Sequence, residues 1–453
     1  MNLLIQNGRI VDPSRNLDEK QDLLIRDGVI SDAGSHRDDQ EEIETIDASG
    51  LVVSPGFIDL HAHLREPGQE HKETIASATK AAVRGGFTAV CAMANTVPPN
   101  DERAVTEMIL AEARRNGICH VYPIGAVSKG LLGEALAELA ELRQAGCVAV
   151  SDDGRPVRNA QLMRRALEYT RMLGIPVIAH EEDSDLAAGG VMHEGYYSTL
   201  LGLTGVPAAA EETMVARDVI LAGAAGGHLH IAHLSTRGGI EAVRAAREDG
   251  VHVTCEVTPH HLSLTDASVT SFSTNHKMNP PLRSEEHRQA LLEAIADGTI
   301  DAIATDHAPH HFDEKNVEFD LAPFGVIGFE TAFAVAYDTL VGTGVIDVSR
   351  LISLFSTGPA RVLSLPGGSL SQGAPGDVTL LDLNGTSEFT DFVSRASNSP
   401  FTGKSFAGKV IGTVVSGRVQ YMDQASLRRQ GRSAKSSEPP ALGSGRKTAK
   451  RKR

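Results

Sequence analysis

Apolar and polar positions follow one pattern at both ends of the chain and another in its middle. Near the start, short apolar runs flank two turn pairs, Asn7-Gly8 and Asp27-Gly28. Each pair predicts a β-hairpin, because Asn-Gly and Asp-Gly are favoured in two-residue hairpin loops. Residues 365–425 resume this style with further short apolar runs. The two ends therefore predict one small β-sandwich domain, built from residues 1–52 and 365–425.

In the middle, residues 53–364, apolar strands alternate with helical segments rich in Ala and Glu. We expect eight strands, at 53–61, 88–94, 119–126, 147–152, 176–180, 228–234, 252–257 and 301–305. We expect helices between them, among them 102–116, 134–145, 158–173, 208–224, 238–249 and 285–297. Eight such units predict an α/β fold of the TIM type, a (β/α)8 barrel with insertions. An open doubly wound sheet is the alternative, and the lack of a Gly-rich phosphate loop in the sequence argues against it.

Composition narrows the class of protein. The chain has 453 residues, 41% of them hydrophobic, and 43 Lys and Arg against 58 Asp and Glu give a net charge of −15. These values are typical of globular proteins and exclude collagen, coiled coil and wholesale disorder. The end of the chain differs, because residues 428–453 hold ten Lys or Arg and one acid. We expect 426–453 to be a basic disordered tail, and the acidic remainder argues against nucleic-acid binding.

The sequence predicts a cytoplasmic location. No apolar run reaches 18 residues and the N-terminus lacks the features of a signal peptide, so we expect neither a membrane span nor export. The four cysteines, Cys91, Cys119, Cys147 and Cys255, form no Cys-x-x-Cys pair. We expect them to be free buried thiols in a reducing compartment.

Histidine, with 18 residues, is the unusual count, and several of these residues stand where predicted strands end. The predicted strands end in the segments 59–65, 151–154, 179–181, 232–235 and 304–310, each of which holds His or Asp. A single polar residue at a strand end is common, but in a barrel these ends share one rim, where catalytic groups gather. Four imidazoles and two carboxylates suit Zn²⁺ or another divalent ion. Six ligands exceed one tetrahedral site and predict two metals that share a bridge.

These residues lie in longer segments that resemble the amidohydrolase superfamily and, within it, the bacterial dihydroorotases. The resemblance covers residues 1 to about 425. It rests on PGFIDLHAHLREPG at 55–68, ANT at 94–96, SDDG at 151–154, KMNPPLR at 277–283 and ATDHAP at 304–309.

The resemblance implies a binuclear zinc centre. One zinc would be held by His61, His63, Asp153 and Asp306, and the other by Asp153, His180 and His233. Many relatives bridge their metals with a carboxylated lysine, whereas no lysine lies between Val148 and Gly154 here. Lys129, the nearest lysine, reads as a helix-start residue. An aspartate bridge matches the dihydroorotase branch and argues against a hydantoinase or allantoinase.

The resemblance also implies the reaction, the reversible cyclisation of N-carbamoyl-L-aspartate to (S)-dihydroorotate and water in pyrimidine biosynthesis. A zinc-bound hydroxide would attack the ring amide, with Asp306 as general base and then general acid. Arg65 and Asn95 match the positions that hold the substrate carboxylate. Further contacts match His63, Asn279, His310, Phe324 and Gly325.

Two alternatives stay open at this point. One is a cyclic amidase of the hydantoinase or allantoinase kind, and the other is a noncatalytic dihydroorotase-like subunit that scaffolds aspartate carbamoyltransferase. Aspartate carbamoyltransferase also remains a partner for an active enzyme, as does a second copy of the chain in a homo-oligomer. Among the remaining histidines, we expect His228 and His230 to be structural.

Overall fold

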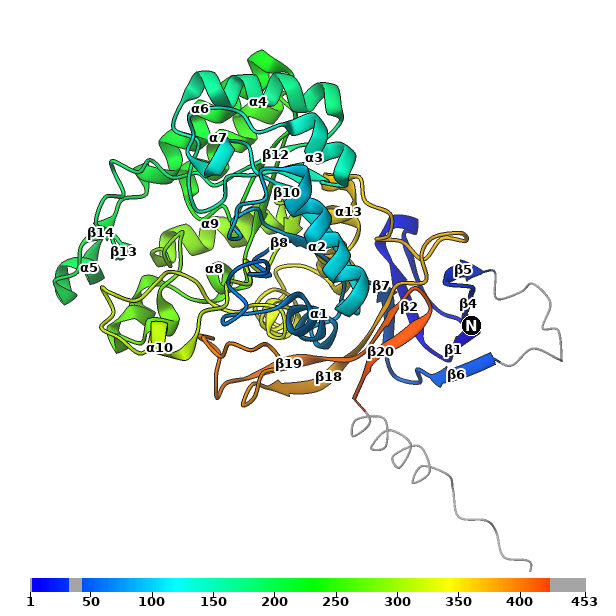
Figure 1. Ribbon diagram of the computed structural model, residues 1–453. Helices are drawn as coiled ribbons and strands as arrows, with labels where there is room; N and C mark the ends of the chain where they lie inside the picture. Colours follow the sequence, from blue (N-terminus) through cyan, green and yellow to red (C-terminus); the bar gives the residue numbers. More distant parts are fainter. Residues whose placement is uncertain (1, 32–42, 424–453) are drawn as a thin grey trace, which may run out of the picture.

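The computed structural model describes residues 2–31 and 43–423, and its centre is the predicted barrel. Eight parallel strands form one sheet in chain order (Figure 1). They are β8 (Phe57–Ala62), β9 (Phe87–Ala92), β10 (His120–Gly125), β11 (Ala149–Val150), β12 (Val177–Ala179), β15 (Leu229–Ile231), β16 (Val253–Val257) and β17 (Ala302–Ile303). A parallel bridge between Ala62 and His307 closes the ring between its first and last strands.

Helices cover the outside of the barrel. The main ones are α1 (Ile75–Arg84), α2 (Arg103–Asn116), α3 (Leu139–Ala145), α4 (Ala160–Leu173), α6 (Ala209–Ala225), α7 (Arg237–Glu248), α9 (Glu285–Ala296), α11 (Ala332–Ala336), α12 (Val348–Phe355) and α13 (Thr357–Leu363). Helix α4 shows how the sequence sets their ends. The side chain of Asn159 caps its first turn, and Gly174 ends it in the left-handed conformation at φ 66°.

Alternate residues of the barrel strands face opposite sides. Leu229 and Ile231 of β15 belong to the large core shared with the helices. Ile178, Ala232 and Ala302 belong to a separate cluster drawn from several strands, which fills the barrel interior. This period of two places every second residue inside the ring.

Two further sheets come from both ends of the described chain (Figure 1). One contains β1 (Asn2–Gln6), β4 (Leu23–Arg26), β5 (Val29–Ser31) and β6 (Ile43–Asp47). The other contains β2 (Arg9–Asp12), β3 (Leu17–Lys20), β7 (Val52–Pro55), β18 (Val378–Glu388), β19 (Ser405–Val415) and β20 (Arg418–Met422). Side chains from both sheets, among them Leu3, Ile25, Val53 and Leu380, form one hydrophobic core.

The structure corrects two details of the prediction. Asp27-Gly28 does join an antiparallel pair, β4 and β5, but Asn7-Gly8 makes no hairpin, because β1 and β2 lie in different sheets. The predicted strand 53–61 is two strands, β7 in a terminal sheet and β8 in the barrel. Gly56 separates them at a close approach, where an added Cβ would lie 2.2 Å from Thr88 Oγ1.

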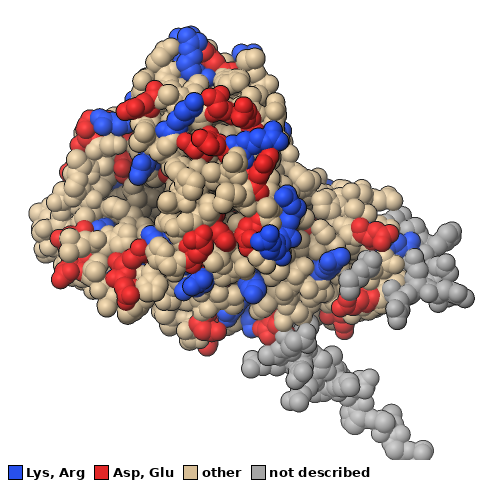
Figure 2. Space-filling model, in the orientation of Figure 1, with Lys and Arg blue, Asp and Glu red and all other residues tan. Residues whose placement is uncertain are grey.

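Shorter elements surround the mouth of the barrel. They are β13 (Met192–His193), α5 (Tyr196–Leu201), β14 (Gly205–Val206), α8 (Pro259–Ser263) and α10 (Phe312–Lys315). None of the helices in the described part of the chain is long and apolar enough to cross a membrane. On the face in Figure 2, acidic and basic side chains are interspersed. The expected tail lies outside the described residues.

An ion pair connects the barrel to a terminal sheet and generates a prediction about pH. His120 Nε2, at the start of β10, lies 3.1 Å from Asp377 Oδ2, next to β18. The hydrogen bond with Asp377 raises the pKa of His120 although burial opposes it. A raised histidine pKa contributes stability below the unfolded value of about 6.5, and this contribution is lost as pH rises through the folded value.

We therefore expect the free energy of unfolding of the wild type to fall between about pH 6 and pH 8 relative to that of His120→Gln. Urea unfolding of both proteins across this range measures the difference. Parallel stability profiles would show that the ion pair contributes nothing to stability.

Candidate functional site

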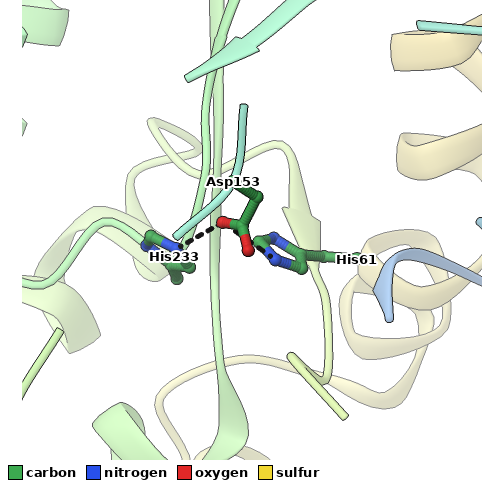
Figure 3. A group of neighbouring side chains, drawn as sticks. All are labelled: His61, Asp153 and His233. Carbon is green, nitrogen blue, oxygen red and sulfur yellow. Dashed lines mark hydrogen bonds and ion pairs between the residues drawn. The ribbon is translucent and has the colours of Figure 1, made fainter. Parts of the chain in front are cut away.

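The ends of the barrel strands bring the six predicted metal ligands together. Asp153, which follows β11, lies at the centre of the group (Figure 3). Its Oδ1 lies 3.3 Å from His61 Nε2 and 3.4 Å from both His180 Nδ1 and His233 Nε2. Its Oδ2 lies 3.4 Å from His63 Nε2. One carboxylate therefore faces four imidazole nitrogens.

Asp306 completes the group from the end of the last strand. Its Oδ1 lies 3.0 Å from His63 Nε2 and 3.6 Å from His61 Nε2. Ligands about 2.0–2.1 Å from a tetrahedral zinc lie about 3.3–3.4 Å from one another, which is close to these separations. The buried His61 Nε2 has no hydrogen-bond partner. The donor set thus fits divalent metal, and two triads share His61: His61, Asp153 and His233, and His61, His63 and Asp306.

The electrostatics of the group also suit a cation. Burial disfavours a charged His61 ring, but Asp153, Glu256 and Asp306 outweigh it and hold its pKa well above the usual range. Burial would likewise raise the pKa of Asp306, but a hydrogen bond from His63 and the nearby imidazoles hold it well below the usual range. The carboxylates of Asp153 and Asp306 are therefore stable as anions only beside positive charge, which divalent ions supply.

Several site residues have backbones in the left-handed region. Arg65, His233 and Asp306 have φ values of 65°, 33° and 47°. Non-glycine residues adopt such values at a cost and are found where surrounding contacts impose them. Next to two of these segments, the carboxylate of Asp59 accepts hydrogen bonds from the backbone N–H groups of His61 and Thr305. Asp59 thereby ties the first strand end to the last.

Asp152, beside the central Asp153, has a different role. Its Oδ1 accepts hydrogen bonds from the backbone N–H groups of Val127 and Ser128, at 2.8 and 3.0 Å. Burial raises its pKa to about 6. The carboxylate of Asp152 therefore connects the ends of two neighbouring strands, while that of Asp153 faces the imidazoles.

Arg65 occupies the rim beside this group. Its side chain is buried, and its Nε donates to the carbonyl oxygen of Pro309 at 3.1 Å. Within 2–31 and 43–423, no carboxylate forms an ion pair with Arg65; Glu66 instead accepts from the backbone N–H of Ile75. Burial lowers the pKa of Arg65 to about 10, which leaves it charged. A buried guanidinium without a carboxylate partner suits an anionic ligand.

The predicted substrate residues Asn95 and Asn279 each contact a histidine of the same group. Asn95 Oδ1 accepts from His63 Nδ1 at 2.8 Å, which directs His63 Nε2 to the carboxylates. Asn279 Nδ2 donates to Glu182 Oε2 at 2.8 Å and lies 3.4 Å from His180 Nε2.

The loop after the last strand is held by the predicted residue His310 and by Asn398, which the sequence does not indicate. His310 Nε2 donates to the carbonyl oxygen of Phe324 at 2.8 Å, and burial lowers the pKa of His310 to about 3. Asn398, from the segment between β18 and β19, accepts from the backbone N–H of His310 and donates to the carbonyl oxygens of Ala308 and Gly325. One amide thereby connects the loop at Ala308 and His310 to the loop at Gly325. Asn398 is far from the barrel strands in sequence. The Asn-Ser-Pro segment that it begins gives no indication of this contact.

Lys315 is a second missed residue. Its buried ammonium donates to the carbonyl oxygens of Lys277, Pro323 and Gly325 at 3.3, 2.9 and 3.0 Å. Lys129 lies on the surface, where it forms an ion pair with Glu138 at 2.9 Å. It is therefore not placed to act as a bridging lysine.

The chain resembles one family of known proteins along most of its length. Residues 50–239 match the family model described as dihydro-orotase-like. A dihydroorotase of Pelobacter propionicus is 49% identical over 423 residues, which are 93% of this chain and 100% of that protein. One of Citrifermentans bemidjiense is 51% identical, with 93% and 100% covered. One of Anaeromyxobacter dehalogenans is 50% identical over 430 residues, with 94% and 99% covered.

Solved structures of hydantoinases share the fold. An L-hydantoinase (dihydropyrimidinase) from Arthrobacter aurescens superposes with a TM-score of 0.82 at 24% identity, covering 92% of this chain and 95% of that one. A dihydropyrimidinase from Brevibacillus agri gives 0.80 at 23% identity, with the same coverage. At this level of identity the similarity shows a shared fold, which is the barrel with its added sheets.

The geometry predicts which histidines bind metal. His61→Ala or His233→Ala removes an imidazole that faces Asp153, so we expect the zinc content of the purified protein to fall. The same substitution at His36, outside both the described residues and the predicted ligands, should leave it unchanged. Elemental analysis after removal of free metal measures zinc per chain, and full zinc content in both ligand variants would contradict the assignment.

Proposed function

The chain belongs to the dihydroorotase family, and from this premise we propose that it closes N-carbamoyl-L-aspartate to (S)-dihydroorotate at a binuclear zinc centre. The reaction is a reversible cyclic amide hydrolysis in pyrimidine biosynthesis. The convergence of six His and Asp side chains beside Arg65, a buried arginine with no carboxylate partner among the described residues, carries the proposal.

We assign the ligands as the family resemblance implies. His61, His63, Asp153 and Asp306 would hold one zinc, and Asp153, His180 and His233 the other, with Asp153 as the bridge. The four imidazole contacts of Asp153 support this role, since each of its oxygens faces at least one ring nitrogen. When bound, the ions supply Lewis acidity and a water acidified to a pKa of about 7.

Asp306 moves the proton. Its carboxylate is buried and anionic beside His63, so it can accept a proton from the attacking water and return it to the leaving ring nitrogen. In the biosynthetic direction the same group takes the proton of the attacking ureido nitrogen. His63 is itself oriented by Asn95, which keeps this part of the site rigid.

Arg65 is the group that selects for a carboxylate. Its planar guanidinium can bind the substrate carboxylate in a bidentate manner, with Asn95 and His310 beside it. Asn279 and the backbone at Phe324 and Gly325 would contact the ring. A ring without a carboxylate would leave Arg65 without a partner, which argues for dihydroorotate over the hydantoins.

Partners and location remain predictions. A homo-oligomer and a complex with aspartate carbamoyltransferase are two assemblies that sedimentation of the chain alone and with that enzyme would test. The exposed apolar side chains of Tyr196 and Leu200 support a contact at α5. All four cysteines are free and buried, which agrees with the proposed cytoplasmic location.

Asp306→Asn tests the proton transfer. The change keeps the volume of the side chain but removes the proton acceptor, so we expect kcat to fall about 10²–10⁴-fold. Zinc content must be measured in parallel, because Asp306 is also a proposed ligand. Asp347→Asn, at the start of α12, is the matched control and should keep the wild-type kcat. An Asp306→Asn enzyme with full zinc and normal kcat would refute the assignment.

Arg65→Met tests substrate selection. It keeps a long side chain but removes the guanidinium, so binding of dihydroorotate should weaken by about 2–4 kcal/mol. Activity on dihydrouracil, which lacks the carboxylate, should fall much less. The measurement is kcat/KM for both rings in both proteins. An equal loss on the two rings would mean that Arg65 supports the rim only structurally, as its bond to Pro309 would allow.

A further inference from the structure

A line of hydrogen-bonded side chains crosses the barrel from its N-terminal end to the metal centre. His228 Nε2 lies 2.8 Å from Thr254 Oγ1, which lies 2.8 Å from His230 Nδ1. The other ring nitrogen of His230, Nε2, lies 3.2 Å from Glu256 Oε2. Glu256 Oε1 lies 2.9 Å from His61 Nδ1. The line thus ends on a proposed metal ligand.

Strand pairing builds this line. His230 of β15 and Thr254 of β16 are partners in the parallel register, so their side chains lie side by side. Glu256 is two residues further along β16 and therefore points to the same side. His61, His230 and Glu256 are fully buried. Barrel interiors are usually filled by branched apolar residues, and a buried carboxylate is costly without partners. The presence of this line of polar side chains inside the barrel therefore needs a specific explanation.

The ionised Glu256 sets the direction of every hydrogen bond in the line, because both of its oxygens can only accept. This direction is the one that metal binding at His61 requires. If His61 Nε2 binds metal with its lone pair, the ring proton must lie on Nδ1, and Glu256 accepts it. The other oxygen of Glu256 accepts from His230 Nε2–H, which leaves His230 Nδ1 as an acceptor for the Thr254 hydroxyl. Thr254 in turn accepts from His228 Nε2–H. One arrangement of protons therefore satisfies all four bonds.

Glu256 reaches a second proposed ligand as well. Its Oε1 lies 3.4 Å from the backbone N–H of His233, at the position where the chain turns to φ 33°. A single carboxylate thus contacts the side chain of one ligand and the backbone of another. Carboxylates that accept from metal-binding histidines orient the ring and make it a stronger ligand.

The outer end of the line is closed by a ring stack. His228 and His252 stack with centroids 3.9 Å apart and an interplanar angle of 11°. Burial, with His252 and His230 nearby, lowers the pKa of His228 to about 3, so its ring is neutral and carries a single proton. The stack and the bond to Thr254 fix the orientation of that ring.

We propose that Glu256, His230 and Thr254 are positioning residues that hold His61 in its metal-binding tautomer and so raise the affinity of the centre for zinc. The inference rests on the proposed binuclear function. It assigns His230, which the sequence suggested was merely structural, a part in metal binding.

Zinc affinity tests the proposal without reference to activity. Glu256→Gln keeps the shape of the side chain but offers His61 a neutral amide, and we expect the zinc dissociation constant to rise about 10–100-fold. Thr254→Val deprives His230 Nδ1 of its donor and should raise the constant by a smaller factor. Competition with a chelator of known affinity measures both. Thr88→Val, which removes a buried hydroxyl bonded only to the carbonyl oxygen of Phe57, is the matched control and should bind zinc as the wild type does.

A double-mutant cycle tests whether Thr254 and Glu256 affect zinc binding through one connected line of hydrogen bonds or independently. If Thr254 acts through Glu256, Thr254→Val should have little further effect in the Glu256→Gln background. Wild-type zinc affinity in both single variants, or effects that simply add, would overturn the proposal. Should Glu256→Gln fail to fold, the difference between Thr254→Val and Thr88→Val decides, because both make the same small change. A wild type that binds no zinc would refute the proposed function itself.

Discussion

One carboxylate organises the centre of this molecule. Asp153 lies within 3.4 Å of four imidazole nitrogens that come from three different strands. Such an arrangement requires the strands to end at one level, which the closed parallel ring provides. It also requires positive charge, because a buried anion among neutral rings is costly. Barrel closure and metal binding are therefore linked, since each strand end that supplies a ligand must keep its register.

The parts of the site that belong to strand ends were predictable from the sequence. His61, His63, His180 and Asp306 follow apolar runs of strand length, and in a barrel such positions share one rim. Local pattern and topology together thus indicate which strand ends meet, whereas the choice of the proposed ligands within them rests on the family resemblance. The pairing Asn7-Gly8 shows where local pattern fails: the turn connects strands of two different sheets, which only the packing of both chain ends decides. Asp27-Gly28, with the same signal, makes the expected hairpin.

Residues that act through other residues were not predictable in this way. Glu256 and Asp59 are acidic residues within apolar strands, and the sequence shows no sign of which ligand each contacts. Asn398 lies about 90 residues from His310, and its hydrogen bonds to that loop form only when the terminal sheet packs beside the barrel. Long-range contacts of this kind depend on the complete fold, whereas motifs near strand ends do not.

The two halves of the site are consequently supported by different parts of the fold. The proposed metal site depends on side chains inside the barrel, where Glu256 and Asp59 contact proposed ligands on rigid strands. The proposed substrate site depends on loops, which Asn398 and Lys315 hold through backbone carbonyls such as that of Gly325. Strands resist displacement more than loops do. Changes inside the barrel should therefore act on metal affinity, and changes around Gly325 on KM, so the two properties can vary separately within one active site.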